Sequence, residues 1–389
     1  MASTNAAPRD FGFGEDETML RDLARRFLDE RMPVETLRRL VAEAPEPIYD
    51  EGQRANWDAG LWDEIVGLGW SGLAVGAAQG GAEISMAGIV GVVEEVGRHC
   101  LPSPLVPTLA TTLALRAVGG EVADGLLARI AAGAPATLAI TGERGSWDPA
   151  APALEACASG DELVLDGKAC FVQDAFKAEL LLATAHLGEE VVLCAVERGA
   201  PGVELHADHI HDLTRDQATV SFRGVAVESA SVVSRDALPA LRSAWPGLVL
   251  LVAADLCGCS EWQLQTTVEY ARNRKQFDRE IGFFQAVKHP LVDAMVEIDR
   301  ARSLLYHAAC EIDRGSDDAE RAARMAKSAA SDAAAFISDR SVQLHGGIGF
   351  TWECDVHIFF KRSMHNQALF GDGVHHRRRL ADLLIGPVE

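Results

Sequence analysis

The chain has 389 residues, too many for one ordinary compact core, so two to three domains are expected. Its formal net charge of −21 excludes a typical nucleic-acid-binding protein, because nucleic acid demands a basic face. A hydrophobic content of 48% with 24% charged residues is typical of a soluble globular protein. The eight cysteines form no Cys-x-x-Cys pair, which indicates reduced thiols and a cytoplasmic protein.

No targeting or membrane segment is predicted. Residues 1–17 lack a basic stretch followed by an apolar one, so we expect no secretory signal. The most apolar run, 245–259, is short and contains Asp255, which predicts a buried helix and no membrane span. Cys257 and Cys259 lie in this run, and its apolar surroundings favour core packing over a metal or redox pair.

Residues 1–135 are predicted to form an N-terminal helical domain. Apolar residues recur at spacings of three and four over 15–45, the pattern of an amphipathic helix. Ser85 stands before a helical pattern and is expected to cap it. The other predicted helices are 57–68, 85–99, 105–117 and 120–132.

Residues 136–237 are predicted to form a β domain. Short β-rich runs separated by Gly, Asp and Pro turns, such as Asp166-Gly167, favour an antiparallel sandwich or barrel. The predicted strands are 137–140, 162–165, 169–172, 179–183, 191–196 and 218–222.

Residues 238–389 are predicted to form a C-terminal four-helix bundle. Small residues in the third helix would let neighbouring helices approach closely. We expect a dimer or tetramer built on this bundle. The predicted helices are 246–274, 283–313, 318–344 and one that begins near 375.

Two motifs about 70 residues apart suggest a phosphate site. The first is 274–277, Arg-Lys-Gln-Phe, and the second is 343–350, Gln-Leu-His-Gly-Gly-Ile-Gly-Phe. An arginine adds a bidentate donor, and glycines let backbone N–H groups approach a phosphate. Two simpler interpretations stay open: Gly346-Gly347 as a helix cap, and Arg274 as a solvated surface charge.

With these motifs, the order helices, β domain, helices resembles the acyl-CoA dehydrogenase family, in an actinobacterial-type branch. The resemblance reaches most of the chain. It implies FAD-dependent α,β-dehydrogenation of an acyl-CoA thioester to a trans-2-enoyl-CoA. It also implies electron-transfer flavoprotein or a similar electron acceptor, and a homo-oligomer or a heteromer with a related subunit.

The resemblance also assigns the cofactor contacts. One departure is Asp278, where a glycine usually follows the phenylalanine; others are Phe171 in place of a flavin-covering tryptophan and Gln173 in place of a threonine. An ordinary strand residue is the alternative for Phe171. The implied FAD contacts are Arg274, Phe277, Gln285, Gln343, Gly346, Gly347, Thr141, Ser146 and Phe171.

The catalytic base departs furthest from the family. The usual glutamate position falls on Gly371, next to Asp372, and the second known position, at Gly247 or Leu248, holds no carboxylate. Asp255 lies about two turns later and is less well placed. Asp372 is therefore the candidate base, with a turn or N-cap role as its alternative.

Three functions remain open from the sequence. The first is a flavin-dependent acyl-CoA dehydrogenase. The second is a non-catalytic partner subunit that completes a site on a related chain which supplies the base. The third is an oxygen-using flavoenzyme on the same fold.

Overall fold

The computed structural model describes residues 14–42 and 57–386. Residues 1–13 and the last part of the helix expected over 15–45 lie outside the described residues. The chain divides into two compact units. The helical unit contains 14–42, 85–101 and 249–386, and the sheet unit contains 57–84 and 102–248.

The N-terminal region is helical, as predicted. The helix expected over 15–45 is two helices, because Pro33 has no N–H to continue the first one and stands as N-cap of the second. Ser85 caps its helix as expected, and its hydroxyl accepts a hydrogen bond from the Gly88 N–H at 3.2 Å. The helices are α1 Glu15–Arg31, α2 Val34–Val41, α3 Ala59–Gly67, α4 Met86–Arg98, α5 Leu105–Val118 and α6 Glu121–Ala131.

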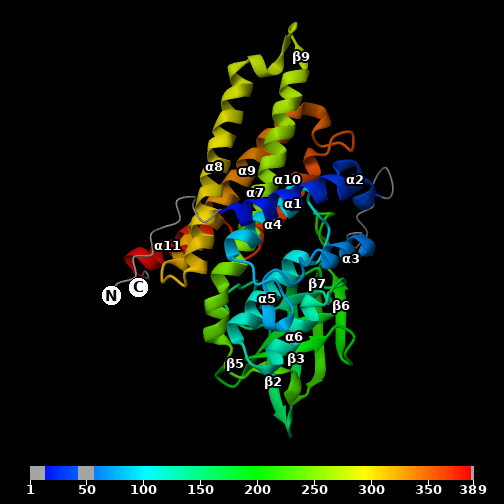
Figure 1. Ribbon diagram of the computed structural model, residues 1–389, viewed down its shortest axis with the longest axis vertical. Helices are drawn as coiled ribbons and strands as arrows, with labels where there is room; N and C mark the ends of the chain where they lie inside the picture. Colours follow the sequence, from blue (N-terminus) through cyan, green and yellow to red (C-terminus); the bar gives the residue numbers. More distant parts are fainter. Residues whose placement is uncertain (1–13, 43–56, 387–389) are drawn as a thin grey trace. The chain divides into compact units, whose positions relative to one another are not determined.

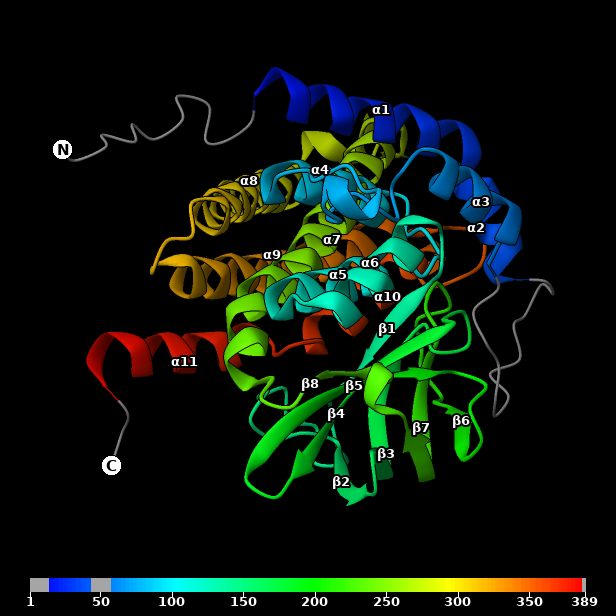
Figure 2. The same ribbon diagram turned by 60° about the horizontal axis from the view of Figure 1, so that its bottom comes forward.

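The middle region forms an eight-stranded sheet in the order β6-β7-β3-β2-β4-β5-β8, with β1 also on β4 (Figure 2). Asp166-Gly167 was expected to be a turn between two strands. It is a bulge inside the single strand β3, since the register with β7 shifts there and Gly167 takes a φ of +133°. The strands are β1 Ala136–Ala139, β2 Leu154–Ser159, β3 Glu162–Gln173, β4 Leu180–Leu187, β5 Glu190–Glu197, β6 Val203–Ala207, β7 Gln217–Val227 and β8 Val232–Ser234.

The expectation of an antiparallel sheet is wrong at β4. This strand pairs in parallel with β1 along 180–183 and with β2 along 185–186. The two short strands therefore follow one another along the same edge of β4. The segment between them, 140–153, leaves the sheet at their junction as a loop.

Both faces of β4 and β5 are buried, which explains their nearly continuous apolar sequences. On one face, Leu181 and Val192 join a core with the side chains of β2, β3 and β7. On the other face, Leu182 and Leu193 pack with residues of α5 and α6. Figure 2 shows these two helices over that face of the sheet.

The C-terminal region has five helices within the described residues, one more than predicted. The additional helix is α10. Its buried side chains include His357, Arg362 and Asn366, so the apolar spacing that marks a helix in sequence is interrupted. The helices are α7 Leu238–Asn273, α8 Gln285–Asp313, α9 Ala319–His345, α10 Val356–Ala368 and α11 Gly373–Ile385.

The alanine-rich helix α9 packs against α8, α10 and α11, as its small residues predict. Figure 1 shows α8 and α9 running alongside one another. The buried alanines of α9, among them Ala326, Ala330 and Ala334, lie on one broad side of the helix. Small side chains on that side let neighbouring helices approach α9 at short distance.

Helices α4 and α7 cross at backbone contact in the helical unit. A Cβ on Gly258 would lie 1.8 Å from the Glu94 carbonyl oxygen, and one on Gly97 would lie 2.1 Å from that of Asp255. Cys257 and Cys259 flank Gly258 and are buried in this crossing, as the sequence suggested. Glycine is thus required here by a close approach of two backbones.

Replacement of Gly258 by alanine is expected to destabilise the protein by on the order of 3 kcal/mol, because the two helices must move apart. Urea unfolding followed by circular dichroism measures the loss. Gly125→Ala in α6 is the matched control, since a Cβ there meets nothing within 4 Å. Equal urea midpoints of unfolding for the two variants would contradict the close contact between the backbones of α4 and α7.

Helix α7 is long and apolar enough to cross a membrane, but 94% of its most apolar window is buried inside the protein. Asp255 lies within this window and is itself fully buried. The core of the fold therefore accounts for the apolar character of the helix.

Candidate functional site

The first motif forms an exposed hairpin between α7 and α8 (Figure 1). Strands β9 Lys275–Gln276 and β10 Arg279–Glu280 pair around the two-residue turn Phe277-Asp278. Both turn residues have positive φ, +55° and +59°, as in a type I′ turn. The turn explains why a glycine would suit position 278, and it leaves the Phe277 ring 87% exposed.

Arg274 stands at the base of this hairpin. Its N–H donates to the Tyr270 carbonyl, and its carbonyl accepts from the Ile281 N–H, both at 2.8 Å. The other cations nearby are engaged: Lys275 pairs with Glu280 at 3.6 Å, and Arg279 lies over the Phe283 ring. Within the described residues, the exposed Arg274 guanidinium has no hydrogen bond or ion pair, so it is available to an anion.

The second motif lies at the C-terminal end of α9, next to the end of α7. The His345 ring stacks on Tyr270 with centroids 4.3 Å apart, and the Tyr270 hydroxyl donates to the His345 carbonyl at 3.5 Å. Gln343 is exposed in the last turn of α9, and Gln285 is exposed in the first turn of α8. The ends of α7 and α9 therefore bring the two motifs into one part of the helical unit.

The two adjacent glycines have different structural roles. Gly346 has a φ of +65° and its N–H donates to the Gln343 carbonyl, so it terminates α9 as the simpler interpretation predicts. Gly347 has no positive φ, and a Cβ there would meet nothing within 4 Å. Packing within the chain does not require a glycine at 347, whereas a close ligand would.

The loop between β1 and β2 carries Thr141 and Ser146. The Thr141 carbonyl accepts from the Cys170 N–H at 2.7 Å, which ties the loop to β3. The Thr141 hydroxyl oxygen is buried and has no hydrogen-bond partner among the described residues. A buried hydroxyl without a partner is costly, and it marks a place for a polar ligand atom. The Ser146 hydroxyl accepts from the Asp148 N–H at 3.2 Å and helps to turn the loop.

Phe171 lies beside the same loop. It has a φ of +58° at a register shift of β3, and its ring is 39% exposed. A Cβ on Gly145 would lie 3.7 Å from this ring, and the Trp147 ring centroid lies 6.4 Å from it. Gln173 donates to the Phe171 carbonyl at 3.1 Å. Phe171 is thus presented at a bulge, unlike an ordinary strand residue.

Asp372 is the N-cap of α11. Its carboxylate accepts a hydrogen bond from the His375 N–H at 2.7 Å. This bond lowers the pKa of Asp372 below its ordinary value. A carboxylate of lowered pKa is a weaker proton acceptor, so the cap role that the sequence left open is present and opposes a role as base.

The two other positions considered for the catalytic base, Gly371 and Asp255, offer no free carboxylate. Gly371 has a φ of +98°, and a Cβ there would lie 2.4 Å from the His375 ring, so a side chain does not fit without a shift. Asp255 is fully buried and accepts hydrogen bonds from Arg362 and Asn366. The Asp255 carboxylate therefore has a structural role, in hydrogen bonds that connect α7 with α10.

Sequence inspection did not find Lys327, which holds the turn before Asp372. Its ammonium is buried and donates to the carbonyls of Asn366, Gln367 and Gly371 at 3.0–3.1 Å. Burial lowers the pKa of Lys327 to about 7. The only sequence signal is a single lysine inside the alanine-rich stretch of α9.

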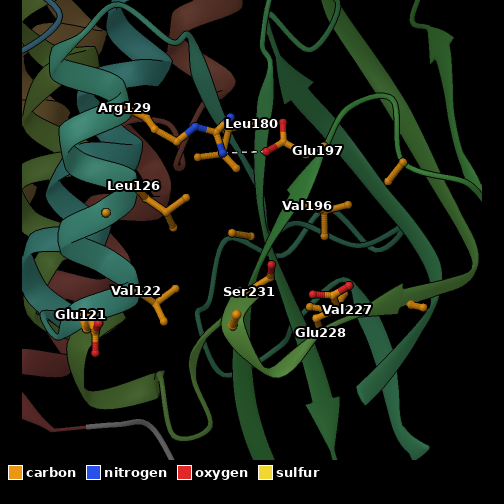
Figure 3. Close-up of a pocket in the computed structure, with 15 residues that line it drawn as sticks. Glu121, Val122, Leu126, Arg129, Leu180, Val196, Glu197, Val227, Glu228 and Ser231 are labelled. Carbon is orange, nitrogen blue, oxygen red and sulfur yellow. Dashed lines mark hydrogen bonds and ion pairs between the residues drawn. The ribbon is translucent and has the colours of Figure 1, made fainter. Parts of the chain in front are cut away.

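A separate groove of about 820 Å³ lies in the sheet unit between α6 and strands β5 and β7 (Figure 3). Leu126 and Val196 are among its apolar lining residues. Arg129 pairs with Glu197 across it at 2.7 Å, and Glu121 and Glu228 add negative charge. None of the predicted site residues lines this groove.

Two family models match this chain, one on each side of the central sheet in the sequence. Residues 14–133 match the family model of the acyl-CoA dehydrogenase N-terminal domain, and 250–385 match that of the C-terminal domain. Acyl-CoA dehydrogenase IpdE2 of Mycobacterium tuberculosis is 31% identical over 339 residues, covering 86% of this chain and 91% of the relative. The chain belongs to the acyl-CoA dehydrogenase family.

Solved structures show the same fold. A chain of the ChsE4-ChsE5 complex from Mycobacterium tuberculosis is 25% identical with a TM-score of 0.86, covering 97% of this chain and 100% of that one. A glutaryl-CoA dehydrogenase from Mycobacterium smegmatis in complex with FADH2 is 18% identical with a TM-score of 0.85, covering 98% of this chain and 97% of that one. The helical N-terminal region, central sheet and C-terminal helices predicted from the sequence are thereby confirmed.

Members of this acyl-CoA dehydrogenase family are FAD-dependent oxidoreductases. Three features of this chain fit such a group: the unpartnered Thr141 hydroxyl, the unpaired Arg274 guanidinium and the open space over Gly347. The first two are hydrogen-bond donors without a partner in the described part of the chain, and the third is space that no residue there fills. The residues present therefore suit a large anionic cofactor.

The buried His357 ring packs edge-on against Trp352, with the ring centroids 4.7 Å apart. Neither ring nitrogen makes a hydrogen bond within the described residues. Burial, reinforced by the Lys361 charge, lowers the pKa of His357 to about 4. Because the unfolded chain binds a proton near the ordinary value of 6.5, this group lowers the stability of the folded state as the pH falls from 6.5 toward 4.

Replacement of His357 by leucine is expected to remove this acid sensitivity. Relative to its stability at pH 7.5, the variant should lose about 2 kcal/mol less than the parent at pH 5. Urea unfolding at both pH values measures the difference. The exposed His206 provides the control His206→Leu. Equal acid losses in the parent and in His357→Leu would contradict a neutral buried ring.

Proposed function

We propose that this protein is an FAD-dependent dehydrogenase that converts an acyl-CoA thioester to the trans-2-enoyl-CoA. The observation that carries the proposal is the buried Thr141 hydroxyl without a partner, beside the bulged Phe171. In an acyl-CoA dehydrogenase these features suit a flavin ring, whose face accepts an aromatic neighbour and whose edge accepts hydrogen bonds.

The proposed roles of the residues follow from what each offers. Arg274 supplies a free charged donor for the diphosphate, and Gly347 leaves room for its approach. Gln285 and Gln343 present exposed amides from two neighbouring helix ends, while Phe277 and Ser146 complete the contacts. When bound, FAD would supply the redox chemistry by taking the β hydrogen of the substrate as hydride, while Asp372, or a carboxylate of a related subunit, would take the α proton. Electron-transfer flavoprotein or a similar acceptor would then take the electrons, in the cytoplasm.

Assembly with a second chain is part of the proposal. Large apolar side chains are exposed on the helical unit, at Phe277, Phe350, Leu384 and Ile385. Phe277 and Phe350 belong to the two motifs of the proposed phosphate site, and Leu384 and Ile385 end α11. Exposed aromatic and aliphatic side chains of this kind suit a contact between subunits. We propose a homo-oligomer or a heteromer with a related subunit.

A second candidate function is a partner subunit whose active site lies on a related chain. Two observations favour it: a side chain at Gly371 would require a positive φ and a shift of the His375 ring, and Asp372 is engaged as a helix cap. The ChsE4-ChsE5 structure is a complex of two named proteins, and a mixed assembly of that kind would let another chain supply the base.

Experiments on the purified chain distinguish the dehydrogenase function from the partner-subunit function. The chain is purified alone, its visible spectrum is recorded, and its sedimentation is measured at micromolar concentration. Mixing with acyl-CoA thioesters should bleach the flavin if the chain is active by itself. Bleaching only after a related subunit is added supports the partner function. A protein that takes up no FAD, alone or with the related subunit, would refute both.

Replacement of Arg274 by alanine is expected to weaken FAD binding by about 1.5–3 kcal/mol, the contribution of a charge-assisted hydrogen bond. Titration of flavin-free protein with FAD gives the dissociation constants. Arg272→Ala is a neighbouring control on α7, because Arg272 is also exposed at the end of that helix. An unchanged dissociation constant in Arg274→Ala would remove this residue from the proposed site.

A further inference from the structure

Four charged side chains are buried together in the sheet unit, at the end of β3. Asp174, Lys177, Arg215 and Asp216 are each at most 7% exposed. The Lys177 ammonium lies 2.5 Å from the Asp174 carboxylate and 3.3 Å from that of Asp216. The Arg215 guanidinium lies 3.3 Å from Asp174. These four residues are called the buried charge cluster.

The cluster is unusual for an element that only stabilises the fold. Withdrawing four charges from water is costly, and apolar side chains of similar volume often give equal or greater stability. Burial and the nearby Asp174 raise the pKa of Asp216, as expected for a carboxylate withdrawn from water beside a like charge. A role in fixing one backbone conformation is a better explanation for such a cluster.

The backbone next to the cluster is strained in two places. Phe171 and Asp174 have φ values of +58° and +50°, in the left-handed region that glycine favours. Side chains other than glycine remain in this region only when the surrounding structure holds them there. The strained segment 171–174 begins inside the register shift of β3, which lies between Ala169 and Val172.

Hydrogen bonds connect the strained segment to the cluster. The Asp174 N–H donates to the Asp216 carbonyl at 2.8 Å, and the Asp174 carbonyl accepts from the Lys177 N–H at 3.0 Å. At the other end, the Cys170 N–H donates to the Thr141 carbonyl. Phe171 is therefore held between the Thr141 loop and the buried charge cluster.

We infer that Asp174, through the buried charge cluster, is a positioning residue that fixes the Phe171 ring for contact with the flavin. This inference rests on the proposed function, because Phe171 is assigned to the flavin there. Asp174 anchors one end of the bulge, and its two cations keep that anchor in place. Without them, the segment relaxes toward ordinary strand geometry and the ring moves.

A double-mutant cycle on FAD binding tests this inference. Asp174→Asn keeps the size of the side chain and its tolerance of positive φ, and removes only the charge. We expect Asp174→Asn to raise the FAD dissociation constant about tenfold when Phe171 is present, but at most about twofold in a Phe171→Ala background. An equal loss in both backgrounds overturns the inference, because it shows a general effect on the fold.

A second readout does not depend on flavin. Amide hydrogen exchange of residues 170–173 in flavin-free protein should be faster in Asp174→Asn than in the parent. Glu204→Gln, which breaks an exposed ion pair with Arg223 on the same sheet, is the control and should leave this exchange unchanged. Unchanged exchange in Asp174→Asn also overturns the inference.

The two possible failures can be distinguished. If the parent binds no FAD, the proposed function fails and the inference fails with it. If the parent binds FAD but the cycle is additive, only the inference fails. If circular dichroism shows that Asp174→Asn does not fold, Lys177→Gln replaces it in the double-mutant cycle. The same changes in the FAD dissociation constant are then expected, and an equal loss in both backgrounds again overturns the inference.

Discussion

Replacement of Arg362 by methionine is expected to destabilise the protein by about 3–5 kcal/mol, among the largest effects of any single substitution in the fold. Arg362 and Asp255 are both fully buried. The guanidinium donates to the Asp255 carboxylate from Nε at 3.1 Å and from Nη2 at 2.6 Å. Removing the guanidinium leaves the Asp255 carboxylate ionised in the protein interior, with Asn366 as a remaining hydrogen-bond donor.

Two further variants make this result specific. Arg300→Met breaks an exposed ion pair with Glu297 and should cost less than about 1 kcal/mol. The double variant Asp255→Leu with Arg362→Met should recover much of the loss, because no unpaired charge remains. Chemical unfolding gives all three values. A loss in Arg362→Met as small as that in Arg300→Met would mean that the pair is not buried in solution.

Replacement of Asp372 by asparagine is expected to slow flavin bleaching by about 100- to 10,000-fold if this chain is active alone, the range for a lost general base. Asparagine is as good an N-cap as aspartate, so the change removes basicity and preserves the start of α11. The readout is the rate of bleaching after mixing with an acyl-CoA.

The control for this substitution is another capping aspartate. Asp58 accepts a hydrogen bond from the Leu61 N–H at the start of α3, and Asp58→Asn should leave bleaching unchanged. An active parent whose Asp372→Asn variant bleaches equally fast would exclude Asp372 as the base. A parent that binds FAD and bleaches only with an added related subunit would place the base on that subunit.

The local structure of this protein was predictable from its sequence. Helical spacing, the Ser85 cap and the alanines of α9 each depend on neighbours within a few residues, so the pattern is complete in a short window. The change to β-rich runs near 136 is local in the same sense. The family motifs around 274 and 346 were also readable, because they are contiguous.

What the sequence did not reveal depends on contacts between distant segments. The parallel pairing of β4 with β1 and β2 arises because two separate strands share one edge. Helix α10 was missed because its polar side chains are buried by partners elsewhere, as Arg362 is by Asp255. No window of local sequence contains both members of such a pair.

The candidate site divides in the same way. The sequence by itself determined which residue types could hold an anionic cofactor, including Arg274 and the two glycines. Only the tertiary structure decided that Asp372 caps a helix, that the His375 ring stands where a side chain on Gly371 would lie, and that Phe171 lies strained beside Thr141. These properties depend on which surfaces meet in space, and a hydrogen bond or a clash exists only after they have met.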